Sequence, residues 1–191
     1  MKRLAILTGI LALAAPLALA QTSTWSIDKN HSEVDFSVRH FGISTVHGRF
    51  GDLSGTILLN EADVTKSSVQ VTIDVTTVDT GVSMRDNDLK GANFFEVATY
   101  PTANFASTSV AKNGAGLTVT GNLTLHGVTK PVVLDVASVN GPITGMDHKP
   151  HYGYSATTTI SRAAFGIGPK YPPAALSDEI KLIIELDAPK Q

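Results

Sequence analysis

The sequence predicts an all-β protein, an eight-stranded antiparallel barrel with one short helix inserted in a long connection. Apolar and polar residues alternate with period two through most of the chain after residue 21, which is typical of strands with one buried and one solvated face. Turn-forming glycines and asparagines separate these segments. No helix-sized segment lies between most of them, so consecutive strands are expected to pair antiparallel.

The expected strands follow this alternation along the chain. In the first long one, Val34, Phe36 and Val38 share one face, while charged and hydroxyl side chains occupy the other. Gly51-Asp52 interrupts the pattern of the second, as a bulge in one long curved strand would. The strands are expected at 31–41, 46–60, 67–78, 102–111, 115–126, 130–139, 151–161 and 178–187, after a short leading piece at 23–28.

Four sets of turn residues are expected between strands, where a positive φ or a fixed turn is needed. They are Gly42, Asn113-Gly114, Gly127 and Asn140-Gly141-Pro142. Closure into a barrel is favoured because it removes the unpaired edges of an open sheet. A barrel with this number of strands is either filled by its own side chains or holds one small or slender ligand.

The connection after the third strand breaks the alternation. Asp, Asn and Gly are poor strand formers, and this stretch contains several of them. Asp79 or Thr80 can cap a short helix over about 83–90, which Gly91 can end. Two aromatic residues, Phe94-Phe95, follow directly.

Residues 1–20 have the form of a cleaved secretory signal peptide. A basic start and an apolar run lead to Ala18-Leu19-Ala20, and cleavage is expected before Gln21. The apolar run is far shorter than the roughly 20 residues that a membrane span needs, so no stable membrane insertion is expected. The mature chain, 21–191, is expected to be a single domain located in the periplasm.

Composition narrows the possible partners. Without Lys2 and Arg3, the mature chain has 13 basic and 17 acidic residues and a formal charge of −4, which provides no electrostatic footprint for nucleic acid. The chain has no cysteine, so disulfides and thiolate chemistry are absent. About 170 residues are enough to bury a substantial core without covalent cross-links.

No catalytic or metal constellation is predicted. Serine and threonine are abundant, but there is no nucleophile elbow and no ordered Ser/His/Asp signature. His31, His40 and His47 lie close in sequence, and His148 and His151 are three apart, yet no metal-binding motif fits. We therefore expect no enzymatic activity, no metal and no cofactor.

Four motifs occur in order along the chain: "DKNHSEVDFSVRHFGISTVHGRF" at 28–50, "DTGVSMRDNDLKGANFFEVATYP" at 79–101, "LTLHGVTKPV" at 123–132 and "TTTISRAAFGIG" at 157–168. Together they resemble the YceI-like, lipocalin-like polyisoprenoid-binding family of exported bacterial proteins. The likeness spans residues 25 to 187. It implies an elongated lipocalin-like barrel whose tunnel holds a long isoprenoid chain, often in a homodimer, without established enzymatic chemistry.

Three residues depart from the pattern of that family. Asp88 stands where a histidine is common, Ala164 where an aspartate is common, and His151 where an arginine is common. All three positions could lie near polar groups of a ligand, so the head group is left open. Arg162 ends a strand and points either to solvent or to a barrel mouth.

The candidate ligand-binding residues form two sets. If the helix crosses one mouth, Phe94 and Phe95 can turn inward as a lid, and a planar Arg85 fork can bind a phosphate or carbonyl head group. The alternative for the helix is a solvated surface with a local ion pair. The tunnel set is Phe36, Val38, Phe50, Val71, Ile73, Phe94, Phe95, Phe105, Leu123 and Ile160; the rim set is His40, Arg85, Asp86, Lys90 and His151.

The sequence thus favours a periplasmic, non-enzymatic protein that sequesters or carries an isoprenoid chain such as a polyprenyl phosphate, a polyprenyl alcohol or a quinone-like tail. Burial of apolar surface would supply the binding energy. The alternative is a non-catalytic periplasmic stress-response or interaction module whose barrel is filled.

Overall fold

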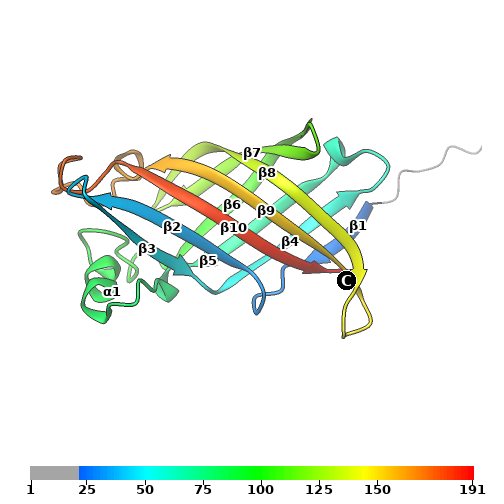
Figure 1. Cartoon of the computed structure of the whole chain (residues 1–191), viewed down its shortest axis with the longest axis horizontal. Coiled ribbons are helices and arrows are strands. Elements are labelled where there is room, and N and C mark those ends of the chain that lie inside the picture. Colours follow the sequence, from blue (N-terminus) through cyan, green and yellow to red (C-terminus); the bar gives the residue numbers. More distant parts are fainter. Residues whose placement is uncertain (1–21) are drawn as a thin grey trace, which may run out of the picture.

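The computed structural model describes residues 22–191 and contains one ten-stranded antiparallel sheet, in the order β1-β4-β5-β6-β7-β8-β9-β10-β2-β3. The sheet curls into an elongated barrel, with α1 at one end of the long axis and the C-terminus at the other (Figure 1). The expected signal peptide lies outside the described residues. The strands are β1 Thr22–Ser26, β2 Glu33–His40, β3 Ser44–Phe50, β4 Leu53–Asn60, β5 Ser68–Asp74, β6 Thr102–Asn113, β7 Gly116–Leu125, β8 Val128–Thr144, β9 Pro150–Ser161 and β10 Glu179–Pro189.

The alternation of the sequence becomes the two faces of the sheet. In β2, Val34, Phe36 and Val38 are buried inside the barrel, while the residues between them are more exposed. β6 and β7 repeat this pattern, with Phe105 and Leu123 paired across the two strands and both facing inward. The predicted all-β barrel fold is confirmed. The alternation predicted it because successive side chains of a strand point to opposite faces of the sheet.

The predicted strand 46–60 was wrong as a single element. Gly51 and Asp52 separate β3 from β4, and the two strands have different neighbours: β3 pairs with β2, and β4 pairs with β1 and β5. The interruption is therefore a full break rather than a bulge. With the leading piece forming β1, the count is ten strands rather than eight.

Each edge strand makes a bridging contact at the seam of the barrel. Trp25 of β1 forms a bridge with Lys190 beyond β10, and Arg49 of β3 forms a bridge with Asp79. The end near β1 is plugged: Trp25 is 1% exposed, Ala188 beside it is fully buried, and Tyr152 packs edge-on against the indole at 4.7 Å.

The predicted turns are mostly confirmed. Gly42, Gly114 and Gly127 have φ values of 68°, 58° and 72°, which glycine adopts at low cost. The turn expected at residues 140–142 was wrong, because β8 continues to Thr144 with an irregular register against β9 between Asn140 and Ile143.

The inserted helix is confirmed as α1, Ser83–Lys90, ended by Gly91. Its expected cap was wrong: the N-cap residue is Val82, which makes no side-chain capping bond. Instead Asp86, inside the first turn, accepts hydrogen bonds from the backbone N–H of Thr80 (2.9 Å) and from its hydroxyl. Three short 3-10 helices complete the structure, at Val64–Lys66, Val75–Thr77 and Ala163–Phe165. Among residues 22–191, no helix has the length and apolar character needed to cross a bilayer.

Candidate ligand-binding cavity

Two adjoining cavities occupy the barrel interior along its axis. The outer one, of about 370 Å³, lies under α1 and the 163–178 connection; the inner one, of about 140 Å³, lies toward the end plugged by Trp25. They share four wall residues, Val34, Ile73, Leu123 and Leu182, which mark the junction between them. The barrel is therefore hollow, and its long axis is the direction in which a slender ligand would lie.

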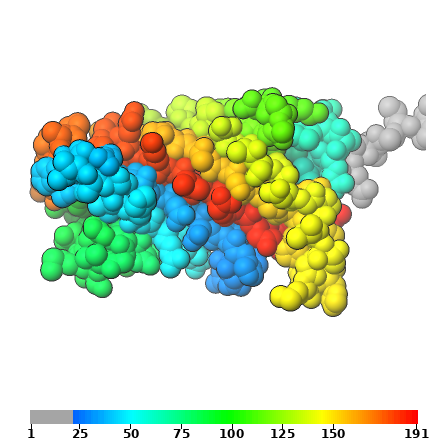
Figure 2. Space-filling view, viewed as in Figure 1, coloured from blue at the N-terminus to red at the C-terminus, as the bar shows by residue number. Residues whose placement is uncertain are grey.

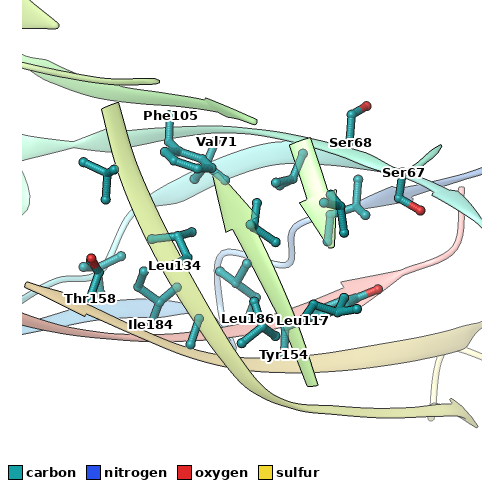
Figure 3. A pocket seen from close by; sticks show the side chains of 18 of the residues that line it. Ser67, Ser68, Val71, Phe105, Leu117, Leu134, Tyr154, Thr158, Ile184 and Leu186 are labelled. Carbon is teal, nitrogen blue, oxygen red and sulfur yellow. The ribbon is translucent and has the colours of Figure 1, made fainter. Parts of the chain in front are cut away.

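The inner cavity has an almost entirely aliphatic and aromatic wall. Inward-facing side chains of β4 to β10 surround it (Figure 3), among them Val71, Phe105 and Ile184. Of its few polar residues, Ser67 turns its hydroxyl to the backbone and accepts a hydrogen bond from the N–H of Asn60 at 3.0 Å. Burial raises the pKa of Tyr154, so this ring is uncharged. The inner end consequently suits a hydrocarbon and offers no charge to a head group.

The outer cavity is closed by aromatic contacts between separate connections. Phe94 stacks on Tyr171 of the 163–178 connection, with ring centroids 5.2 Å apart, and Phe95 packs edge-on against Phe50 of the barrel wall at 5.5 Å. Leu89 of α1 also faces the cavity. These side chains form a lid over one barrel mouth, in the position that the sequence predicted for Phe94 and Phe95.

All ten residues of the predicted tunnel set line one or both cavities. The outer cavity is lined by Phe36, Val38, Phe50, Phe94, Phe95 and Ile160, the inner one by Val71 and Phe105, and the junction by Ile73 and Leu123. Period two places them there, since each lies on the inward face of its strand or in the lid.

Only part of the predicted rim set lines a cavity. His40 and Arg85 line the outer cavity, and so does Asp88, which the sequence identified only as a departure from the family pattern. Arg85 donates two hydrogen bonds to Thr80, from Nε to the hydroxyl at 2.7 Å and from a terminal nitrogen to the carbonyl at 2.9 Å. Asp86 is occupied by its bonds to Thr80, and neither it nor Lys90 lines a cavity. A cation and a carboxylate therefore stand together at the mouth.

Arg162 is a structural residue that sequence reasoning left undecided. It is only 4% exposed, and its guanidinium donates five hydrogen bonds to backbone carbonyls within 163–178. The acceptors are Ile167, Gly168, Tyr171, Leu176 and Ser177, at 2.6 to 3.0 Å. All five donors of the side chain are used, so Arg162 holds one side of the mouth together rather than binding a ligand. No local pattern could have indicated this, because every partner is a backbone atom.

The expectation that His151 lies with Arg85 and His40 at the mouth was wrong. It lies at the start of β9, opposite Pro189, at the far end of the strand from Ile160. Its Nδ1 lies 2.7 Å from a carboxylate oxygen of Asp187 and its Nε2 lies 2.9 Å from one of Asp147, so the protonated ring can donate to both. The side chain thus ties the β8–β9 connection to β10 at the plugged end, and it lines neither cavity.

A second carboxylate–imidazole pair lies beside this one. His31 is bonded to Asp28 at 2.7 Å, and ligand-type atoms of Asp28, His31 and Asp187 lie within 4.8 Å of one another. The sequence gave no indication of this cluster, because its members come from the β1–β2 turn and from β10. Hydrogen bonding between the carboxylates and the imidazoles accounts for their positions.

The His151 contacts predict a pH-dependent contribution to stability. Hydrogen bonds to Asp187 and then to Asp147 raise the pKa of His151 above its ordinary value of 6.5. This contribution is fully present below about pH 6.5 and is lost as pH rises through the raised folded-state pKa. We expect a loss of roughly 0.5–1 kcal/mol, since the pair lies at the surface. Thermal unfolding followed between pH 5 and 9 measures it.

The variant His151→Gln provides the control, because glutamine can still hydrogen bond to a carboxylate but does not titrate. Its stability should change less than that of the wild type over this pH range. Equal pH dependence in the two proteins would show that the His151 contacts are not the cause.

The fold and the cavity together define a lipocalin-like barrel with a lidded, largely apolar interior. The YceI-like domain model matches residues 25–188, and the chain belongs to this family. A UPF0312 protein of Pectobacterium atrosepticum is 37% identical over 193 residues, which cover 100% of this chain and 98% of that protein.

Two solved structures show the same fold. The crystal structure of BcnA from Burkholderia cenocepacia matches with a TM-score of 0.77 and 26% identity, covering 84% of this chain and 98% of BcnA. A polyisoprenoid binding domain from Saccharophagus degradans, implicated in plant cell wall breakdown, matches with a TM-score of 0.63. That domain is 19% identical, with 90% of this chain and 100% of the domain covered, so the likeness extends to the fold alone.

Proposed function

We propose that this protein is an exported, periplasmic, non-enzymatic lipid carrier that sequesters an isoprenoid chain. The observation that carries the proposal is the polarity of the hollow barrel: its inner end is apolar and plugged, and its charged side chains, Arg85 and Asp88, stand at the lidded mouth. A long apolar chain with one polar end fits this distribution. The likeness to a polyisoprenoid binding domain and membership of the YceI-like family support the same ligand class.

Binding would proceed with the hydrocarbon tail entering first. A tail in the inner cavity removes its apolar surface from water at about 25 cal/mol per Å², without leaving a charge unsolvated. The opposite orientation would bury a polar head among Val71, Phe105 and Ile184, where few polar groups such as the Tyr154 hydroxyl are at hand, and this costs free energy. Phe94 and Phe95 would move to admit the ligand and then cover it.

The decisive experiment is native mass spectrometry of the protein purified from the periplasm of its own organism, followed by solvent extraction. We expect a stoichiometric adduct whose extracted lipid series is spaced by isoprene units. A protein mass without adduct that stays unchanged after incubation with polyprenyl lipids would contradict the proposal. That result would favour an interaction module whose partners bind the outer surface.

A further inference from the structure

Five apolar side chains are exposed around the mouth of the barrel. Phe41 is 61% exposed, Ile43 83%, Val82 47%, Met84 78% and Tyr171 42%. They come from three connections: the β2–β3 turn, the start of α1, and the 163–178 connection. We refer to these five as the mouth rim. Figure 2 shows the three segments gathered at the same end of the molecule, away from the C-terminal strand end.

The mouth rim is continuous with the interior of the barrel. Phe41 and Tyr171 line the outer cavity and are also exposed on the outside. The N–H of Phe41 donates to the carbonyl of Ala175 at 2.9 Å, and Tyr171 stacks on Phe94, so the three connections contact one another. An apolar path therefore runs from the cavity to the outer surface at this end.

Phe41 occupies a backbone conformation that disfavours phenylalanine. Its φ is 49°, and Gly42 follows at 68°, so the first two of the three turn residues are left-handed. Asparagine or glycine adopts this conformation at lower cost, and a bulky residue there is unusual. Burial of the ring does not offset this backbone cost, because the side chain is mostly exposed. An exposed aromatic side chain on a strained backbone points to contact with a partner.

We propose that the mouth rim docks onto the surface of a lipid bilayer and that ligand passes between the bilayer and the outer cavity at this contact. This inference rests on the proposed function: an isoprenoid lipid resides in membranes, and a direct path spares its hydrocarbon from water. Apolar side chains on three separate tips can enter the headgroup region without a complementary protein surface. Two exposed cations adjoin the rim in sequence, Arg39 before Phe41 and Lys170 before Tyr171, and such charges attract lipid phosphates. Arg39 uses part of its guanidinium to bond Thr45 and the carbonyl of Gly42.

The other end of the barrel provides a matched control. Ile143 and Met146, in and after β8, are 68% and 100% exposed, but they lie at the plugged end and line no cavity. A double serine substitution there removes as much exposed apolar surface as one at Phe41 and Ile43. If any exposed apolar surface bound vesicles, the two double substitutions would weaken binding equally. If the mouth rim is the docking site, only the substitution at the rim weakens it.

The test is cosedimentation of the purified protein with phosphatidylcholine vesicles, together with the rate of transfer of geranylgeraniol from those vesicles. The variant Phe41→Ser/Ile43→Ser should lower both by at least about tenfold, because each side chain loses favourable apolar burial. The Ile143→Ser/Met146→Ser control should match the wild type. Val82→Ser/Met84→Ser, on a different connection, should reproduce the loss if the turn variant fails to fold.

Three results would overturn docking: vesicle binding of the rim variants equal to wild type, an equal loss in the control, or a dimer by light scattering that depends on Phe41 and Ile43. Uptake of geranylgeraniol from detergent micelles separates this inference from the proposed function. Uptake from micelles by the wild type and by Val82→Ser/Met84→Ser, whose side chains do not line the cavity, means the carrier function stands whatever the vesicle result. No uptake from either source in the wild type contradicts the carrier function itself.

Discussion

Replacing Arg162 with methionine is expected to lower the free energy of unfolding by about 3–5 kcal/mol, the largest effect of any single substitution at the mouth. Methionine preserves much of the packing but removes five donors from buried and half-buried carbonyls, of which that of Gly168 still accepts from the N–H of Tyr171. Each unsatisfied buried acceptor carries a desolvation cost, and water can restore only part of the loss. Denaturant unfolding and hydrogen exchange of the amides in 163–178 measure the two consequences.

Arg162→Lys separates the charge from the shape of the side chain. Lysine keeps the positive charge but has three donors on one nitrogen, which cannot reach carbonyls spread from Ile167 to Ser177. We therefore expect stability between those of wild type and methionine, with 163–178 still exchanging faster than in the wild type. Wild-type stability and exchange in the methionine variant would show that the five hydrogen bonds do not hold this connection.

The second large effect is expected at the inner cavity. Ala156 lies on β9, is 5% exposed and lines the inner cavity. A tryptophan at this position should occupy space that the end of a long isoprenoid chain would fill. Excluding about one isoprene unit costs roughly 4 kcal/mol at 0.8 kcal/mol per buried carbon, so affinity for a long polyprenol should fall by at least about a hundredfold. Titration with polyprenols of increasing length measures this.

Thr157→Trp is the matched control, because the adjacent residue is exposed on the outer face of the same strand. It adds the same ring without entering the barrel, and affinity should be unchanged. Short isoprenoid alcohols that fit in the outer cavity should bind Ala156→Trp as they bind the wild type. An undiminished affinity of Ala156→Trp for long polyprenols would place the ligand elsewhere. Ala156→Leu offers a milder filling if tryptophan prevents folding.

The geometry of the mouth bears on the choice of head group. Arg85 already donates two hydrogen bonds to Thr80, which orients its guanidinium from within its own connection. Asp88 lines the same cavity, so a doubly charged phosphate would meet a carboxylate as well as a cation. Arg162 adds positive charge nearby but has no donor left to offer. Recognition of a polar head group therefore depends on Arg85 and Asp88 of α1 and on His40.

Much of this protein was determined by sequence patterns that act locally. Alternation placed Phe36, Phe105 and Ile160 on the inward face, because the side of a strand on which a residue lies depends only on counting by two. Poor strand formers followed by Gly91 predicted α1 correctly. These features require no knowledge of which strands are neighbours.

Tertiary structure alone decided where along the barrel each residue lies. His151 and Ile160 share one strand, yet register places the first at the plugged end and the second near the mouth. Arg162 acquires its role from five carbonyls that only the folded 163–178 connection brings together. The break at Gly51 likewise follows from β3 and β4 pairing with different strands. Position along the barrel depends on register and closure, which are set by contacts between residues distant in sequence, and a local pattern contains no information about them.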